Sequence, residues 1–368
     1  MREKYLIAHV FFFSFGYSML SFELPPFLTL LGANQFYLGE MGFLLMLPNI
    51  LLPILFFRIS DLKIVYRLIV ISVLITDFSI LFFYFIKSLE ILLFLILLIG
   101  VGQFIWWITT EIFFSNLSRD SKLINIYSSI WGIAYFIAPL VSSYFISIFG
   151  YGSNLIFSFL IIFFSLVLLI SYRPKQYKII EQTFNNGKKI FVDSFFPSFG
   201  VGLVFSIFYS IFPGFLFKNG YSILLLGIII TASSLTRLIG FFLVINLRDV
   251  KNMERIMKFS FLLLLFIIFP FFTLNFFVIL IMALVIGFGS SVGISIPLIY
   301  ISKKKDSDIS KNIAIYELSF GASVSIFSLF LGWISQNYGN KTPYLIDFII
   351  VLIVSFIYIY LKSKEKNI

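Results

Sequence analysis

Long apolar stretches alternate with short polar connections along the whole chain. The apolar stretches are too long for buried strands, which usually run about 4–8 residues. A membrane-spanning helix needs roughly 20 apolar residues, and helices satisfy their own backbone hydrogen bonds in lipid, so each stretch is predicted to be a membrane helix. About twelve helices are predicted, at 5–31, 36–58, 65–87, 90–117, 123–149, 153–172, 191–217, 222–247, 255–273, 275–301, 312–336 and 342–362.

The composition agrees with lipid as the solvent. Of the 368 residues, 60% are hydrophobic and 12% are charged, and Phe alone occurs 51 times. Soluble proteins average about 45–50% apolar and about 25% charged residues. This difference argues against a soluble enzyme or a nucleic-acid-binding protein, despite the net charge of +10. With no cysteine and a single histidine, His9, we expect no metal site and no cofactor.

The positive charges predict an orientation, because cytoplasmic loops of membrane proteins carry an excess of Lys and Arg. With the N-terminus in the cytoplasm, 23 of the 27 Lys and Arg residues fall on the cytoplasmic side. Lys87, Lys218 and Lys341 fall on the other side, and Arg237 lies within a helix. We therefore expect a multi-pass protein of the cell membrane with both termini in the cytoplasm.

A polar segment near the middle divides the chain. Residues 173–189 contain Pro174, Asn185, Asn186 and Gly187, which favour a loop. We predict two six-helix bundles, at 1–172 and 191–368, joined by a cytoplasmic linker at 173–190. The alternative interpretation of this segment is a regulatory or partner-binding loop.

Short motifs recur in the same order in both halves, 184–189 residues apart. Parallel repeats of this kind are one architecture of secondary transporters, whose substrate site lies between the halves near the middle of the membrane. The repeat therefore predicts a site between two similar bundles. The matching segments are 14–16 with 198–200, 25–28 with 213–216, 99–102 with 286–289, and Ser121-Lys122, Tyr127 and Gly132 with Ser310-Lys311, Tyr316 and Gly321.

The connection after the second predicted helix carries an acid closely followed by cations, Asp61, Lys63 and Arg67. It resembles the Gly-x-x-x-Asp-Arg/Lys-x-Gly-Arg/Lys-Arg/Lys signature of the major facilitator superfamily. Asp61 matches the acid, the two glycines and the first cation of the signature are replaced, and Lys63 and Arg67 can supply displaced charges. The resemblance implies a gating role at the cytoplasmic face. The alternative is a solvated cluster of ions at the helix ends.

The fifth predicted helix contains a run of small residues around a proline: Ala134, Ala138, Pro139, Ser142 and Ser143. This run resembles the Gly-x-x-x-Gly-Pro-x-x-Gly-Gly pattern of antiporters in the same superfamily, with each Gly replaced by Ala or Ser. The resemblance implies an export antiporter, and Pro139 is expected to kink the helix. The alternative is an ordinary packing face, because small residues let membrane helices approach closely.

Ionisable groups inside membrane helices are costly and therefore indicate function. In the superfamily, the first, fourth, seventh and tenth helices usually line the cavity, with the second, fifth, eighth and eleventh alongside. That arrangement favours four groups and leaves Asp77 and Asp347 to structural pairing. Gln103 and Trp107 share a helix face with one of the four, at a spacing of four residues. The four favoured groups are Glu23, Glu111, Arg237 and Glu317.

Glu23 and Glu111 are the first candidates for proton coupling, because a buried carboxyl can bind and release a proton as its surroundings change. Glu23 could instead reach external water, and Glu111 could pair with a cytoplasmic cation such as Arg119. Arg237 could hold an anionic substrate or pair with a carboxylate. His9 is expected to lie too close to the cytoplasmic end to be central.

The sequence thus predicts an all-α secondary transporter of the major facilitator type that moves a small molecule by alternating access, coupled to protons or another ion. Export of an amphipathic compound is slightly favoured over uptake of a sugar, peptide or organic anion. An integral-membrane enzyme acting on lipid-like substrates is an alternative, as is a non-transporting scaffold. The expected partners are the substrate, the coupling ion and the lipid bilayer, with no nucleic acid, and the chain is expected to be a monomer.

Overall fold

The structure is a computed structural model that describes residues 3–56, 61–117, 121–172, 188–245, 250–303 and 309–365. Within these ranges every regular element is a helix. Ten helices of the described chain are long and apolar enough to cross a membrane. The predicted helix ends at 57–58 and 246–247 and most of the predicted linker, at 173–187, lie outside the described residues.

The helices follow the predicted order along the chain, with breaks inside several of them. The first half comprises α1 (Glu3–Leu30), α2 (Gln35–Met46), α3 (Pro48–Leu51), α4 (Pro53–Phe56), α5 (Leu62–Phe85), α6 (Leu89–Leu117) and α7 (Ser121–Ser171). The second half comprises α8 (Lys188–Ser206), the π-helix η1 (Ile207–Ile211), α9 (Phe212–Lys218), α10 (Ile223–Ile245), α11 (Val250–Leu264), the 3-10 helix η2 (Leu265–Ile268), α12 (Phe269–Phe272), α13 (Phe276–Lys303), α14 (Ile309–Tyr338) and α15 (Thr342–Glu365).

The predicted continuous helix at 36–58 is wrong, because the chain forms α2, α3 and α4 there. Pro48 and Pro53 begin α3 and α4. A proline has no backbone N–H to donate to the preceding turn, and its ring clashes with that turn, so a helix is interrupted where a proline enters. The two interruptions flank Asn49, which belongs to the candidate site described below.

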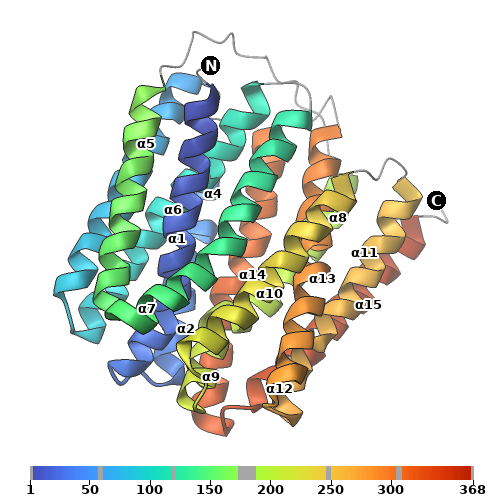
Figure 1. Cartoon of the computed structure of the whole chain (residues 1–368). Coiled ribbons are helices and arrows are strands. Elements are labelled where there is room, and N and C mark those ends of the chain that lie inside the picture. The colour runs from blue at the N-terminus through green and yellow to red at the C-terminus, as the bar shows by residue number, and fades with distance from the viewer. Residues whose placement is uncertain are drawn as a thin grey trace.

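Helix α7 joins the two predicted helices at 123–149 and 153–172. All of its 51 residues are assigned to one helix, but Gly150 has non-helical dihedral angles, with φ 80° and ψ 170°. Figure 1 shows the two legs of α7 meeting at a corner near its label. At about 1.5 Å per residue, 51 residues exceed the length of one crossing. The length of α7 is therefore compatible with two crossings, and the count of twelve stays a prediction.

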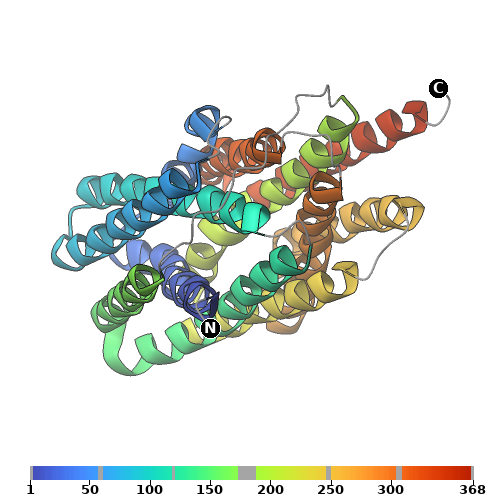
Figure 2. The same cartoon turned by 90° about the horizontal axis from the view of Figure 1, so that it is seen from above.

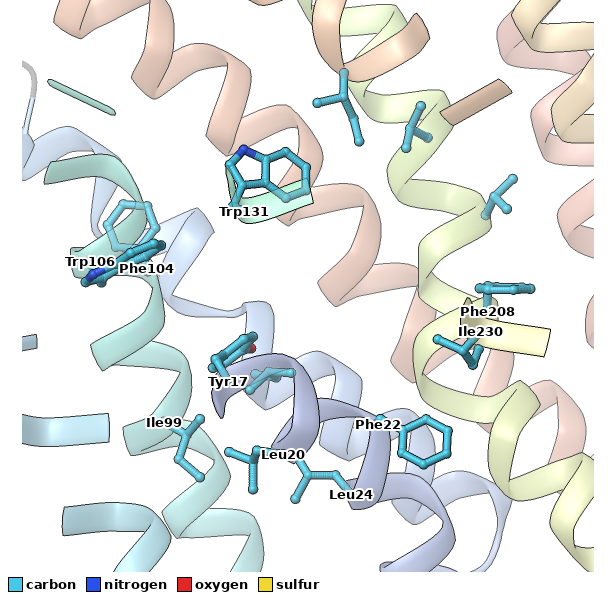
Figure 3. Packing of buried hydrophobic residues seen from close by; sticks show 14 of the residues in the cluster. Tyr17, Leu20, Phe22, Leu24, Ile99, Phe104, Trp106, Trp131, Phe208 and Ile230 are labelled. Carbon is cyan, nitrogen blue, oxygen red and sulfur yellow. The ribbon is translucent and has the colours of Figure 1, made fainter. Parts of the chain in front are cut away.

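The start of α1 and the end of α15 lie at the same end of the bundle, which we call the terminal end (Figure 1). The opposite end, where α1 ends and α15 begins, is the distal end. Viewed from above, the blue and green helices of the first half gather on one side, and most of the yellow, orange and red helices of the second half gather on the other (Figure 2). The buried apolar cluster is nevertheless continuous, since it includes Leu20 and Phe22 of α1 together with Phe208 and Ile230 (Figure 3).

The repeated glycine motif makes corresponding contacts in the two halves. A Cβ at Gly100 would lie 2.4 Å from a carbonyl oxygen of α2, and one at Gly287 would lie 2.0 Å from a carbonyl oxygen of α10. Two residues later, Gly102 and Gly289 approach backbone carbonyl oxygens of α5 and α11 in the same way. Only glycine permits such close packing of backbones, which explains why the motif occurs twice.

The two halves touch where α2 meets α14 and where α7 meets α10. Near the distal end, a Cβ at Gly39 would lie 2.6 Å from the Ser328 oxygen and 2.9 Å from the Gly332 Cα. In the second contact, a Cβ at Gly227 of α10 would lie 3.1 Å from the Pro139 oxygen of α7. Small residues therefore bring the halves into direct contact at this end.

Gly150→Ala is expected to lower the free energy of unfolding by about 1–3 kcal/mol, the usual cost of a side chain in a backbone region that only glycine occupies. Nothing lies within 4 Å of the added Cβ, so the cost would come from the backbone alone. Thermal unfolding in detergent micelles measures the change. The control is Gly152→Ala, in the following helical turn, where the nearest atom belongs to the half-exposed ring of Tyr84. Equal stability of the two variants would contradict the prediction.

Gly39→Ala is expected to destabilise the contact between the halves by about 1–3 kcal/mol, a typical cost of overpacking. The added methyl group would meet backbone atoms of α14, which cannot move alone. Gly132→Ala is the matched control, because it also lies between the halves but its Cβ would meet the end of the Leu238 side chain at 3.0 Å. Thermal unfolding in detergent micelles compares the two variants. An unchanged midpoint for Gly39→Ala would contradict the close contact of α2 with α14.

Candidate functional site

Two carboxyl groups from opposite halves meet between the halves. Glu111 lies on α6 and Glu317 on α14, and only 7% and 4% of their surfaces are exposed. Their carboxyl groups lie close enough to interact electrostatically. Two carboxylates in such a position repel each other, and a proton held between them relieves the repulsion. The sequence singled out both residues but did not indicate that they form a pair.

Each carboxyl of the pair has a neutral hydrogen-bonding partner. The Asn49 amide on α3 donates to Glu317 Oε2 over 3.3 Å, and the Trp107 side chain hydrogen-bonds to Glu111. Asn49 can reach α14 because Gly321 has no side chain, and a Cβ there would lie 2.1 Å from the Asn49 Cβ. The break between α2 and α3 and the glycine on α14 thus place the amide beside the pair.

Two buried phenols complete the surroundings of the carboxyl pair. Tyr127 on α7 and Tyr316 on α14 both interact electrostatically with Glu111 and Glu317. The Tyr127 hydroxyl has no hydrogen-bonding partner among the described residues. These two tyrosines are also a matched pair of the sequence repeat, so each half contributes one phenol to the same polar cluster.

A buried cation, Arg237, lies on α10. Arg237 is 4% exposed, and its guanidinium donates a hydrogen bond to the Tyr209 hydroxyl on η1. The guanidinium carbon lies 4.9 Å from the centre of the Phe205 ring and 5.5 Å from that of Tyr209. Its Nε has no hydrogen-bonding partner, and no carboxylate of the described residues lies within 4.0 Å of the guanidinium. Of the two roles predicted for Arg237, pairing with a carboxylate is therefore not observed here.

Aromatic rings connect the carboxyl pair with Arg237. Trp107, which contacts Glu111, packs edge-to-face on Trp131 with ring centres 5.3 Å apart, and Trp131 packs on Tyr135 at 5.6 Å. Tyr135 in turn interacts electrostatically with Arg237. Trp131 also touches the Phe241 ring of α10, with ring centres 5.0 Å apart. Figure 3 shows Trp131 in the region between α6 and α8, so this aromatic cluster spans the two halves.

Glu23 does not join this cluster. Its carboxyl accepts a hydrogen bond from the Asn154 amide on the second leg of α7, over 2.6 Å, and Glu23 and Asn154 are both fully buried. The predicted alternative, a carboxyl that reaches external water, does not fit a residue with no exposed surface. Glu23 therefore lies inside the first half, although the pattern of charges along the chain ranks it equally with Glu111.

His9 is also held inside the first half. The Trp106 indole donates to His9 Nε2 over 3.0 Å, which leaves Nδ1 to donate to the Ser165 carbonyl oxygen, also over 3.0 Å. A neutral imidazole with its hydrogen on Nδ1 satisfies both contacts. His9 therefore has a structural position, away from the carboxyl pair.

The remaining helix-embedded polar groups, Gln103, Asp77 and Asp347, are also buried. Gln103 shares the face of α6 with Trp107 and is 8% exposed. The structural pairing expected for Asp77 and Asp347 is not seen. Among the described residues, no hydrogen-bonding partner is found for Oδ1 of Asp77 or for either carboxyl oxygen of Asp347. Arg119, the cation predicted as an alternative partner for Glu111, lies outside the described residues.

Asp61, the acid of the loop motif, begins a helix. It is the N-cap of α5, and its carboxylate accepts a hydrogen bond from the Lys63 backbone N–H over 2.8 Å. The Lys63 and Arg67 side chains are exposed at the terminal end. A carboxylate at this position stabilises the first turn of a helix whether or not it also acts as a gate.

The small residues of α7 form a buried face. Ala134, Ala138, Pro139, Ser142 and Ser143 are all buried. The Ser142 hydroxyl donates to a carbonyl oxygen of α1 over 3.3 Å, and Ser143 lies against a glycine of α10. Helical dihedral angles continue through Pro139, and the residue of α7 with non-helical angles is Gly150, 11 residues later. The kink at Pro139 stays a prediction.

Sequence reasoning missed Asn49 and Tyr209. Asn49 is a polar residue inside an apolar segment, next to a proline, and that combination was the only available signal. Tyr209 is one of 19 tyrosines, and nothing in the sequence indicates the π-helix in which it lies.

Comparisons with known proteins agree with this architecture. Residues 6–309 match the family model described as Major Facilitator Superfamily. The crystal structure of the nucleoside transporter NupG is 14% identical, with a TM-score of 0.68 over 97% of each chain. The crystal structure of a point mutant of the same transporter is 13% identical, with a TM-score of 0.72 over 98% of this chain and 99% of the other. No curated protein sequence matches the chain.

At such low identity, the two structures establish a shared fold and nothing more. The family model covers most of the chain, from the start of α1 to the start of α14. The chain therefore belongs to the major facilitator superfamily and is a multi-pass membrane transporter rather than an enzyme.

Proposed function

We propose that this transporter moves a small molecule by alternating access and couples that movement to protons through Glu111 and Glu317. The observation that carries the proposal is the meeting of two carboxyl groups from opposite halves. When α6 and α14 are close, a shared proton relieves the repulsion between the carboxylates. When the halves separate, water can reach each carboxyl and the proton is released. Motion of the halves would thus drive binding and release of a proton.

The moving parts of this mechanism are the two bundles at 1–172 and 191–368, with the linker at 173–190 between them. Residues 188–190 begin α8, and 173–187 lie outside the described residues. Twelve crossings with both termini in the cytoplasm are part of the proposal. The common position of the two chain ends and the excess of cations on that side support it.

The close contacts at the distal end indicate which way the structure is closed. The pairing of Gly39 with Gly332, and of Gly227 with Pro139, leaves no room for a solute between those helices. Under the proposed topology, this end faces the outside. Alternation then requires α2 to separate from α14 at the distal end, while Asp61, Lys63 and Arg67 would help to close the terminal end.

Export by antiport and uptake by symport both remain compatible with a carboxyl pair. The small-residue face of α7 favours export through its resemblance to antiporters. The similar solved structures are named as nucleoside transporters, so nucleosides belong in a test panel beside organic anions, sugars, peptides and amphipathic cations.

Purified protein in liposomes that contain a pH-sensitive dye tests the coupling. A transported member of the panel should move protons when it is added, in either direction. Glu111→Gln and Glu317→Gln should each reduce this proton movement by about 5–150-fold, the factor that corresponds to a typical coupling free energy between two sites. Exchange of the same solute across the membrane at equal pH should continue in both variants.

Glu23→Gln is the matched control, because it makes the same chemical change at a fully buried carboxyl inside one half. It should retain proton coupling. Undiminished proton movement in both Glu111→Gln and Glu317→Gln, or an equal loss in Glu23→Gln, would refute the assignment of coupling to this pair.

A further inference from the structure

Arg237 is a buried cation to which the described residues offer no counter-charge. Burial of a guanidinium is costly unless an anion and hydrogen-bond acceptors accompany it. Within the described part of the chain, the one acceptor that Arg237 contacts is the neutral Tyr209 hydroxyl, and the buried Nε–H of Arg237 has no acceptor. Glu111 and Glu317 are held by Trp107 and Asn49, and neither forms an ion pair with Arg237.

The rings beside Arg237 hold the cation in position but do not neutralise it. Phe205 and Tyr209 lie within cation–π distance of the guanidinium, at 4.9 and 5.5 Å. Such contacts orient an arginine and partly offset its desolvation. Because the Tyr209 hydroxyl accepts from Arg237, its own hydrogen stays free to donate to a third group. The Arg237 Nε–H and the Tyr209 hydroxyl are therefore two donors to which the described residues offer no acceptor.

A local distortion of the helix places Tyr209 at this point. It lies in η1, a π-helix of five residues, in which the Phe212 backbone N–H reaches the Ile207 carbonyl oxygen five residues earlier. A π-helix turn costs stability and occurs frequently at functional sites. Here it brings a phenol to a buried arginine at the contact of the two halves.

The other half faces the same point with aromatic rings. Trp107 and Tyr135 are only half-buried, although they lie inside the bundle, and with Trp131 they form the edge-to-face cluster described above. Ring faces and edges of this kind complement a flat aromatic molecule. One side of the site thus offers a cation and hydroxyl donors, and the other offers aromatic surface.

We infer that Arg237, with Tyr209, binds the oxyanion of an aromatic substrate whose ring lies against Trp107, Trp131 and Tyr135. This inference rests on the proposed transport function and names its substrate class, an aromatic carboxylate or phosphate. The substrate supplies the counter-charge that the protein lacks, and its ring supplies a contact with both halves.

Binding measurements on the purified chain in lipid nanodiscs test the inference. The probes are benzoate, phenyl phosphate, benzamide and cyclohexanecarboxylate, and quenching of tryptophan fluorescence, checked by calorimetry, reports binding. At least one aromatic oxyanion should bind, and the probe that binds better shows whether the site prefers carboxylate or phosphate. Benzamide, which lacks the charge, and cyclohexanecarboxylate, which lacks the aromatic ring, should each bind more weakly by about tenfold or more.

Arg237→Gln should weaken binding of the aromatic oxyanion by about 10- to 100-fold, as expected when hydrogen bonds to a charged group are lost. Arg237→Lys keeps the charge but not the planar set of donors, and Tyr209→Phe keeps the ring but not the hydroxyl. The affinity of each of these two variants for the oxyanion should therefore lie between that of the wild type and that of Arg237→Gln. If Arg237→Gln does not fold, these two variants carry the test. Arg255→Gln is the control, since it removes an exposed arginine from the same half and should leave binding unchanged.

Three results would each overturn the inference. The first is that neither benzoate nor phenyl phosphate binds. The second is that the Arg237 variants bind the aromatic oxyanion as tightly as the wild-type protein does, and the third is that benzamide or cyclohexanecarboxylate binds as tightly as the aromatic oxyanion. Proton movement, measured in the liposome assay described above, separates this inference from the proposed function. If oxyanion binding depends on Arg237 but wild-type protein moves no protons with the bound probe, proton coupling fails and the substrate site stands. If coupling through the carboxyl pair holds for another solute while the Arg237 variants bind oxyanions normally, the substrate site fails alone.

Discussion

A polar group in a hydrocarbon environment must find its partner within the protein, and the rest of this structure depends on that constraint. The backbone satisfies this constraint by forming helices, which are the regular elements of the described chain. Side chains meet it with local partners: Ser72 and Ser165 donate to carbonyl oxygens one turn back in their own helices. Glu23 with Asn154, and His9 with Trp106, meet it across neighbouring helices of one half.

Several groups that one half does not satisfy alone meet between the halves. Glu317 depends on Asn49 of the other half, and Glu111 lies beside Glu317 rather than beside a cation. Arg237 is left with a phenol and ring faces. Polar groups with incomplete partners inside a membrane protein are costly. In the proposed function, a proton completes the carboxyl pair and a substrate completes Arg237, which links stability with transport.

Close packing by small residues is what allows these groups to meet. Gly321 makes room for Asn49, and the glycines of α2 and α10 bring α14 and α7 into direct contact with the other half. Larger residues at these positions would hold the halves apart. The positions of the carboxyl pair and of the arginine therefore depend on residues that carry no chemistry themselves.

The sequence by itself determined the helical class, the order of the helices and the repeat, because hydrophobic length and glycine spacing are local properties of the chain. It also identified Glu111, Glu317 and Arg237, since charges inside apolar helices are conspicuous. Only the tertiary structure decided that Glu111 meets Glu317 whereas Glu23 turns to Asn154. The physical reason is that a helix embedded in an apolar bundle is hydrophobic all round, so its rotation is set by close packing with its neighbours and not by its own pattern.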